Sequence, residues 1–157
     1  MVLVAPQGTG QALEIMLVED SLLDARVTIE SLRNCGFLHR LTLFRDGHEA
    51  IEFLHQRGVF ARAPQPDVIL LDLYLPDTDG VSFLRQLRTD PRLMNIPVVV
   101  LTSSGEGTYR QQCEQLGVSS YITKPFNEDK FLAVMRRLKG LSLTMESSLT
   151  PVTVVST

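Results

Sequence analysis

Five side chains that could bind a cation or a phosphoryl group lie at the ends of short strand-like segments in this sequence. They are Glu19, Asp20, Asp72, Thr102 and Lys124. Carboxylates brought together repel one another, and the pKa of each rises unless a cation lies among them. Oxygen ligands at an open surface suit Mg²⁺, which binds one or two carboxylates together with a phosphate. A lysine ammonium and a threonine hydroxyl suit phosphoryl oxygens. Gathered by a fold, these residues predict a phosphoryl-acceptor site with a magnesium ion.

Asp72 is the candidate nucleophile of such a site. Phosphoryl transfer requires charge neutralisation and in-line positioning more than covalent help from the protein, so a carboxylate beside a cation can accept the group as an aspartyl-phosphate. Simpler interpretations stay open at this point. An aspartate after a strand is often a loop residue or a helix cap. Glu19 and Asp20 could form a solvated turn, and Thr102 could be an ordinary strand threonine.

Strand-like and helix-like segments alternate five times along the chain. The segments 68–71 and 98–101 are apolar without interruption, which is typical of central parallel strands covered on both faces. Apolar residues in the intervening segments recur at roughly helical spacing. The expected strands are 13–18, 39–44, 68–71, 98–101 and 119–123, and the expected helices are 22–35, 49–56, 80–87, 107–116 and 127–140.

Five such units with short connections predict an α/β fold in which right-handed crossovers make all the strands parallel. The flavodoxin-like solution for a small domain is a doubly wound five-stranded parallel sheet with strand order 2-1-3-4-5 and helices on both faces. Ligands bind at the carboxyl edge of such a sheet, where the first, third, fourth and fifth strands present the five polar residues. The second strand offers nothing comparable at its end. The topology therefore gathers residues that lie far apart in sequence.

Four short motifs, each at the end of an expected strand, resemble the receiver domains of two-component response regulators. They are Val18-Glu19-Asp20, Leu70-Leu71-Asp72 with Pro76 and Asp79-Gly80, Val100-Leu101-Thr102-Ser103, and Lys124-Pro125-Phe126. Any one motif is a weak signal, because acidic pairs after strands are common. All four in order are specific, and the resemblance covers roughly residues 13–139.

The resemblance implies a role for each polar residue, and no key position departs from the family pattern. Asp72 is similar to the phosphorylated aspartate, and Lys124 to the lysine that contacts the phosphoryl group, before a cis peptide bond at Pro125. Thr102 and Tyr121 resemble the switch pair, in which the threonine moves towards the phosphoryl group and the tyrosine turns inward. Mg²⁺ is the implied cofactor, and its implied ligands are Glu19, Asp20, Asp72 and the backbone carbonyl of Tyr74.

The resemblance also implies partners. A sensor histidine kinase donates the phosphoryl group, and the extended connection 53–67 and the segment 89–97 are similar to small regulators that pair with cyanobacterial phytochrome kinases. The implied homodimer forms through the fourth helix, fifth strand and fifth helix. Because only a short tail, 141–157, follows the last helix, we expect output through a downstream protein or a phosphotransferase. The chain would be a stand-alone signalling protein, not an enzyme, with self-phosphotransfer and self-dephosphorylation as its only chemistry.

Composition narrows the class of protein. The chain has 157 residues, of which 44% are hydrophobic and 21% charged, as in one ordinary globular domain. We expect an N-terminal extension at 1–12, a receiver domain at 13–140 and a Ser/Thr-rich tail at 141–157. The tail is expected to lack regular structure, although 151–155 could add a strand to a neighbouring chain. A net charge of −3 gives no reason to expect nucleic-acid binding.

The remaining sequence features favour a cytoplasmic protein without a further catalytic or metal site. The first residues lack the pattern of a signal peptide, and no apolar stretch reaches the length of a membrane span. Cys35 and Cys113 match no metal spacing and are expected as reduced, partly buried thiols. His39, His48 and His55 are expected at surface or edge positions, without a catalytic role.

Three rival functions fit the same fold. A haloacid-dehalogenase-type phosphohydrolase needs a second aspartate two residues after the nucleophile, where this chain has Tyr74. A flavodoxin-like flavin carrier needs a hydroxyl- and glycine-rich first loop, whereas Glu19, Asp20 and Asp24 would repel a phosphate there. A receiver-like binding module that is never phosphorylated is the remaining alternative. It is disfavoured because every phosphorylation residue of the family pattern is present.

Overall fold

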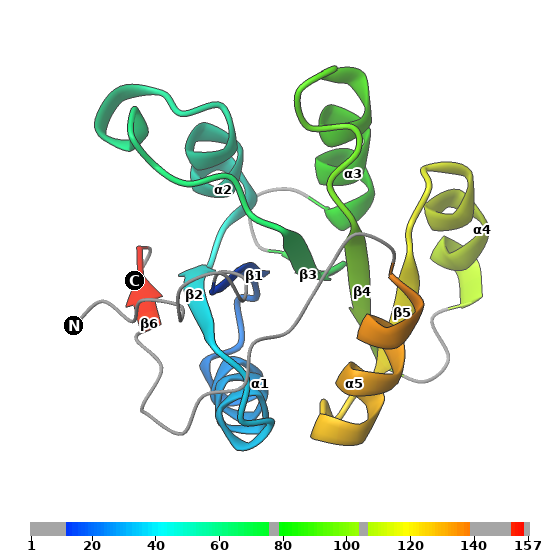
Figure 1. Cartoon of the computed structure of the whole chain (residues 1–157). Coiled ribbons are helices and arrows are strands. Elements are labelled where there is room, and N and C mark those ends of the chain that lie inside the picture. Colours follow the sequence, from blue (N-terminus) through cyan, green and yellow to red (C-terminus); the bar gives the residue numbers. More distant parts are fainter. Residues whose placement is uncertain (1–11, 76–78, 104–106, 139–151, 156–157) are drawn as a thin grey trace.

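A parallel β-sheet forms the centre of the molecule (Figure 1). The computed structural model describes residues 12–75, 79–103, 107–138 and 152–155. Five strands run in the order β2-β1-β3-β4-β5 with every pairing parallel, which confirms the predicted flavodoxin-like topology. The strands are β1 (Leu13–Val18), β2 (His39–Phe44), β3 (Val68–Asp72), β4 (Val98–Thr102) and β5 (Ser120–Thr123).

Five α-helices alternate with these strands, as predicted. One turn of 3-10 helix, η1 (Gly58–Phe60), lies in the long connection before β3. The helices are α1 (Leu22–Asn34), α2 (Gly47–Leu54), α3 (Gly80–Thr89), α4 (Gly107–Gln115) and α5 (Glu128–Arg137).

Polar side chains fix where four of these helices begin. In each case the residue before the helix accepts a hydrogen bond from a backbone N–H three positions on, which satisfies one of the free donors of the first turn. Asp46 accepts from Glu49 in this way, so α2 begins at Gly47 and not at the predicted Glu49. The other capping residues are Ser21, Asp79 and Asn127.

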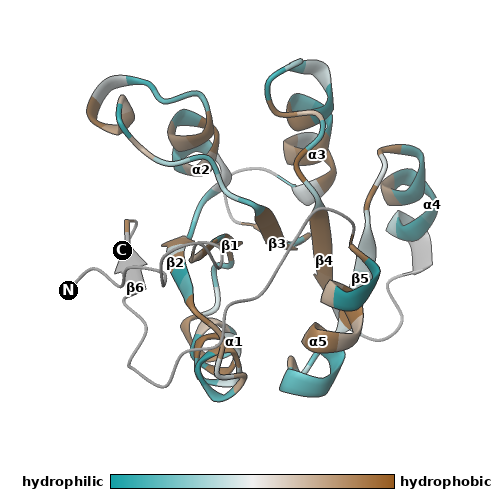
Figure 2. Ribbon diagram, in the orientation of Figure 1, coloured by the Kyte–Doolittle hydropathy of each residue, from teal (hydrophilic) through white to brown (hydrophobic). Residues whose placement is uncertain are grey.

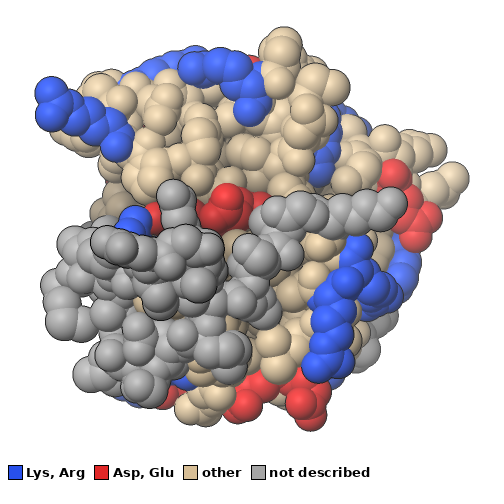
Figure 3. All heavy atoms as spheres, viewed as in Figure 1, with Lys and Arg blue, Asp and Glu red and all other residues tan. Residues whose placement is uncertain are grey.

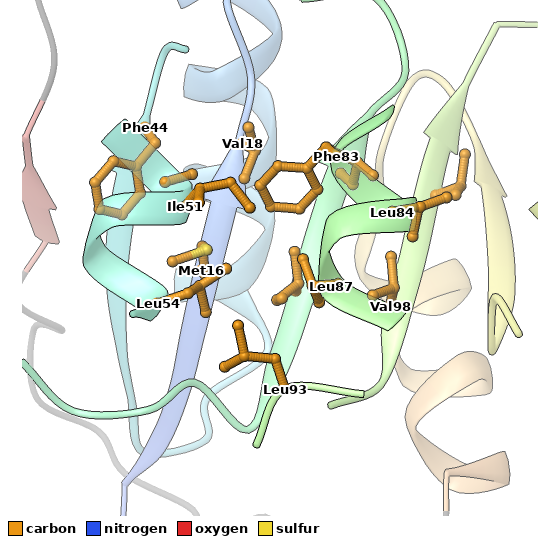
Figure 4. Close-up of a cluster of buried hydrophobic side chains, with 14 of the residues drawn as sticks. Met16, Val18, Phe44, Ile51, Leu54, Phe83, Leu84, Leu87, Leu93 and Val98 are labelled. Atoms are coloured by element: carbon orange, nitrogen blue, oxygen red, sulfur yellow. The ribbon is translucent and has the colours of Figure 1, made fainter. Parts of the chain in front are cut away.

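The helices cover both faces of the sheet, with α1 and α5 on one side and α2, α3 and α4 on the other (Figure 1). The apolar sides of the helices turn towards the sheet (Figure 2). Each face therefore has its own hydrophobic core. Figure 4 shows the core beneath α2 and α3, which is built from Met16, Val18, Phe44, Ile51, Leu54, Phe83, Leu84, Leu87, Leu93 and Val98.

The two central strands are buried on both faces, as their apolar sequences predict. Residues 68–71 and 98–100 are all 0% exposed. A parallel strand buried on both sides cannot slip by one residue without exchanging its two sets of packed side chains. This burial fixes the position of Asp72 at the end of β3.

A sixth strand, β6 (Val152–Val154), extends the sheet and differs from the sequence-based expectation for the tail. It pairs in parallel with β2 of the same chain, where Leu43 lies opposite Val154. The backbone N–H of Val155 also donates to Leu43 O at 3.0 Å. The segment was expected to lack regular structure or to pair with a neighbouring chain. Instead it forms hydrogen bonds with backbone donors and acceptors along the edge of β2 in its own chain.

Other expectations about single residues have mixed outcomes. The prediction for His39 was wrong: it is 1% exposed, and its Nδ1 lies 2.9 Å from Phe37 O. Burial lowers the pKa of its imidazole. Cys35 and Cys113 are free thiols, as expected. The N-terminal residues 1–11 and most of the tail lie outside the described residues.

Charge and hydropathy of the described parts agree with the composition. On the face seen in Figure 3, basic and acidic side chains stand in several separate places and not in one basic field. None of the helices in the described ranges combines the length and the apolar character needed to cross a membrane.

The turn from β3 into α3 depends on a close approach that only glycine allows. The N–H of Gly80 donates to Leu73 O at 2.7 Å, and a Cβ at position 80 would lie 2.6 Å from Leu73 Cα. This contact holds the first residue of α3 against the segment that follows Asp72. Residues 76–78 lie outside the described residues.

Gly80→Ala tests this close approach. Helix propensity alone predicts a gain of about 1 kcal/mol, because alanine is the better helix former. We expect the opposite sign, a loss of about 1–2 kcal/mol in the free energy of unfolding, because the added methyl group overlaps backbone atoms that cannot move aside. Urea denaturation measures the change. Gln86→Ala, at an exposed position of the same helix, is the control and should be nearly neutral; a stabilised Gly80→Ala protein would contradict the packing.

Candidate functional site

The carboxyl edge of the sheet brings together the residues that the sequence singles out. Asp72 ends β3 opposite Leu101 of β4, and Thr102 ends β4 opposite Thr123 of β5. Glu19 directly follows β1, and its N–H donates to Phe44 O at 2.9 Å. Lys124 directly follows β5, and its N–H donates to Thr102 O at 2.8 Å. The main chain thus holds these positions at one edge, as predicted.

The ammonium group of Lys124 lies among three carboxylates. Its Nζ is 2.9 Å from Asp24 Oδ2, 3.0 Å from Glu19 Oε1 and 3.5 Å from Asp72 Oδ2. The peptide bond that follows it, to Pro125, is cis, as the resemblance implies. Burial alone would lower the pKa of the ammonium, but the three carboxylates outweigh that effect and hold it above its usual range. Lys124 therefore carries a positive charge in the middle of the site.

Glu19 is a fully buried carboxylate whose charge is only partly compensated. Its side chain is 0% exposed, and its Oε2 accepts from the Ser21 N–H at 3.2 Å. Its Oε1, although close to Lys124, makes no hydrogen bond of good geometry with the described residues. Burial and then the neighbouring Asp72 carboxylate raise the pKa of Glu19, and the attraction of Lys124 offsets this only in part. The site thus favours an additional positive charge, either a proton or a metal ion.

Asp20 points out of this cluster, towards an arginine that the sequence analysis missed. Arg45, the residue after β2, donates from its Nε and Nη2 to Asp20 O at 3.2 and 3.1 Å. Its Nη2 also lies 3.7 Å from Asp20 Oδ1. The expectation that the second strand offers nothing comparable at its end overlooked Arg45, which lies there and contacts Asp20. The signal was available, because Arg45 occupies the same place after its strand as Glu19 and Lys124 occupy after theirs.

Asp72 is held by its neighbours in the β3–α3 segment. Its side chain is 11% exposed, and its Oδ1 accepts a hydrogen bond from the Tyr74 N–H at 3.1 Å. Tyr74 in turn pairs with Asp79 as an isolated antiparallel bridge, just before α3. The backbone thereby fixes Oδ1 of the carboxylate, and Oδ2 lies towards Lys124.

The two residues predicted as a switch pair lie on adjacent strands. Thr102 is half-buried, and its hydroxyl donates to Ser103 O at 3.0 Å. The Tyr121 hydroxyl donates to Arg110 O at 3.1 Å, and the Arg110 guanidinium lies 4.3 Å from the centre of the Tyr121 ring. Tyr121 is therefore tied to α4 in this structure, on the side of the sheet where α4 packs.

The donor set suits a small hard cation, although the carboxylates are not arranged as a finished metal site. Within the described part of the chain, no three His, Cys, Asp or Glu side chains lie together in a way that could hold an ion. Lys124 lies within ion-pair distance of Glu19 and Asp72, and Arg45 holds Asp20. The buried and incompletely bonded Glu19 Oε1 is the atom that a cation would satisfy. Oxygen ligands of this kind fit Mg²⁺.

The raised pKa of Glu19 has a consequence for stability. In the folded protein its proton is held to a higher pH than in the unfolded chain, so the folded state loses stability as the pH rises from about 4.5. Glu19→Gln should remove this penalty. In the presence of a chelator we expect the variant to be more stable than the original by on the order of 1 kcal/mol at pH 8.

The gain in stability of the Glu19→Gln variant over the original protein should be smaller at pH 5.5, where Glu19 is protonated in the folded protein and resembles glutamine. Chemical denaturation at the two pH values measures both differences. A variant that is equally destabilised at pH 5.5 and pH 8 would show that the Lys124 ion pair outweighs the burial of Glu19.

Comparison with known proteins agrees with this geometry. A family model described as the response regulator receiver domain matches residues 15–136. The response regulator Rcp1 of Synechocystis sp. is 42% identical over 113 residues, which are 72% of this chain and 77% of that protein. A solved Mn²⁺-bound form of Rcp1 superimposes with a TM-score of 0.71 and 39% identity, over 83% of this chain and 98% of that one.

Two further solved structures are similar. The phosphorylated cyanobacterial phytochrome response regulator RcpA has a TM-score of 0.72 and 39% identity, over 84% of this chain and 98% of its own. The bacteriophytochrome response regulator RtBRR has a TM-score of 0.76 and 35% identity, over 84% of this chain and 81% of its own. With the family model matching most of its length, this chain belongs to the response regulator receiver domain family.

Proposed function

We propose that this response regulator accepts a phosphoryl group from a histidine kinase onto Asp72, with Mg²⁺ as cofactor, and that the modification switches a partner-binding surface. The surroundings of Asp72 carry the proposal. One carboxylate oxygen is fixed by the Tyr74 N–H, and the other lies 3.5 Å from the Lys124 ammonium at a slightly exposed position. A carboxylate that is held in place beside a cation and keeps a small exposed surface suits a phosphoryl acceptor.

In the proposed step a carboxylate oxygen of Asp72 attacks the phosphorus atom of a phosphohistidine. The O–P bond forms as the P–N bond breaks, and the imidazole leaves and takes up a proton. Lys124 pairs with the oxygens of the transferred group, for which its three donors are suited. Thr102, at the neighbouring strand end, donates its hydroxyl to the same group. The protein contributes position and charge, and only Asp72 forms a bond.

The proposed ligands of Mg²⁺ are the carboxylates of Glu19, Asp20 and Asp72 and the backbone carbonyl of Tyr74. Bound there, the ion supplies positive charge that offsets the charge developing on the transferred group. The oxygen-only donor set supports this choice, and so does the solved Mn²⁺-bound form of Rcp1, a relative at 39% identity. To join the set, Asp20 has to exchange its contact with Arg45 for one with the ion.

The proposed output is a change of surface and not catalytic turnover. A phosphoryl group adds roughly −1.5 to −2 charge at neutral pH. Thr102 moves towards it, and Tyr121 leaves its contact with Arg110 and turns inward, which remodels the surface made by α4, β5 and α5. The resemblance to RcpA and RtBRR supports a phytochrome-type kinase as the donor. The same α4–β5–α5 surface is proposed to form a homodimer and to engage a downstream protein or a phosphotransferase.

Replacing the phosphoryl acceptor tests the proposal directly. With acetyl phosphate and Mg²⁺, the original protein should gain one acid-labile phosphoryl group, and Asp72→Asn should gain none, because an amide cannot form the acyl phosphate. Asp79→Asn is the matched control, since it is a carboxylate of the same turn and asparagine caps a helix equally well. Intact-protein mass spectrometry counts the groups. Labelling of Asp72→Asn at the original level would place the acceptor elsewhere.

The strength of Mg²⁺ binding should depend on pH. Because burial raises the pKa of Glu19, a proton competes with the ion near neutral pH, and the affinity should increase as the pH rises from 6 to 8.5. Titration calorimetry measures the affinity and the proton released. Glu19→Gln should bind Mg²⁺ more weakly and lose most of the pH dependence. An unchanged dependence in this variant would mean that a different group takes up the proton.

A further inference from the structure

An aromatic contact joins the segment after Asp72 to α4. The rings of Tyr74 and Tyr109 meet edge to face, with their centres 5.9 Å apart and their planes at 82°. Tyr74 lies two residues after Asp72, and Tyr109 lies in the first turn of α4. The Tyr74 ring is 54% exposed, whereas Tyr109 is half-buried and packs against the core beneath α3. The contact therefore bridges a loop at the phosphoryl-acceptor site and the start of a helix.

The main chain ties Tyr74 to the acceptor. Its N–H donates to Asp72 Oδ1 at 3.1 Å, and its bridge to Asp79 leaves its backbone little freedom to move independently. When a phosphoryl group is attached to Asp72, the two carboxylate oxygens cease to be equivalent, and the oxygen bonded to phosphorus becomes a poorer acceptor. If Oδ2 takes the phosphoryl group, Oδ1 becomes a neutral carbonyl oxygen, which accepts the Tyr74 N–H more weakly than a carboxylate oxygen does. A change at Asp72 is thus passed to the position of Tyr74.

The next residue of α4 extends the path to β5. Arg110 places its guanidinium 4.3 Å from the centre of the Tyr121 ring, and its backbone carbonyl accepts the Tyr121 hydroxyl. Consecutive residues of α4 therefore contact Tyr74 on one side and Tyr121 on the other. Of the α4 side chains that the structure describes, only Cys113 is buried. Tyr109 is half-buried, and its ring contact lies in the first turn, so this contact helps to set the position of the helix.

We propose that Tyr74 and Tyr109 form a relay that passes the phosphorylation state of Asp72 through α4 to Tyr121. This inference rests on the proposed function and adds a second route beside Thr102. Tyr74 is a positioning residue in this relay, and its ring contacts Tyr109. The path is a physical chain of a hydrogen bond, a ring contact and a stacked guanidinium, and the ring contact can be removed by one substitution.

The tyrosines of the chain provide a direct readout. The sequence has three tyrosines and no tryptophan, and all three tyrosines belong to the relay. In the double variant Tyr74→Phe, Tyr109→Phe, both rings are kept and Tyr121 is the only remaining emitter. In Tyr74→Phe, Tyr109→Leu, the emitter is the same but the second ring is gone. The two proteins differ at residue 109 alone, so the comparison removes the ring contact together with the packing of that ring against the core.

The experiment measures the change in Tyr121 emission on addition of acetyl phosphate and Mg²⁺, divided by the labelled fraction of Asp72 from mass spectrometry. We expect a clear change with both rings present and a several-fold smaller change in the leucine variant. Tyr74→Leu, Tyr109→Phe should give the same loss. Removing both rings should reduce the response no further than removing one, because the two residues act in a single path.

The outcomes separate the relay from the proposed function. An equal emission change per labelled Asp72 in the phenylalanine and leucine variants would overturn the relay and leave phosphorylation intact. Absence of labelling in the original protein would instead overturn the proposed function and the relay with it. Far-UV circular dichroism checks that each variant is folded. If the Tyr109→Leu protein unfolds, the Tyr74→Leu, Tyr109→Phe variant decides the question.

Discussion

The ammonium group of Lys124 makes this site possible. Two carboxylates, those of Glu19 and Asp72, lie almost completely buried side by side, which would be strongly unfavourable without a cation between them. Lys124 supplies that charge and is itself held by Asp24 at the rim. The compensation is incomplete, since the pKa of Glu19 stays raised. A site in this condition attracts a further positive charge, and this links its electrostatics to the proposed Mg²⁺.

The sheet provides the rigidity that such a cluster needs. β3 and β4 are covered on both faces, and their register is fixed by side chains that leave no room for movement. Asp72 is therefore presented from a rigid strand, whereas α4 has one buried side chain, Cys113, among those that the structure describes. A ring contact between Tyr74 and Tyr109 joins the β3–α3 turn to α4. A phosphoryl acceptor on a rigid strand, beside a helix with little buried side-chain surface, is a suitable arrangement for the proposed switch.

Much of this structure could be predicted from the sequence, because hydrophobic periodicity and strand-end chemistry are local signals. Uninterrupted apolar runs identified β3 and β4, and the order of the strands was taken from the flavodoxin-like solution for a small parallel α/β domain. Contacts made by long or aromatic side chains could not be predicted in this way. The reach of Arg45 to Asp20, the burial of His39 and the pairing of β6 with β2 depend on where distant segments meet in space. The contact between the rings of Tyr74 and Tyr109 likewise depends on where distant segments meet in space.

Mapping the phosphoryl group on the unaltered protein tests the central claim most directly. After reaction with acetyl phosphate and Mg²⁺, borohydride reduction converts an aspartyl-phosphate into homoserine, which peptide mass spectrometry locates by residue. We expect homoserine at position 72 alone, and none when the metal is removed by a chelator before the reaction. Homoserine at another aspartate, or an unmodified Asp72 in a protein that carries a phosphoryl group, would contradict it.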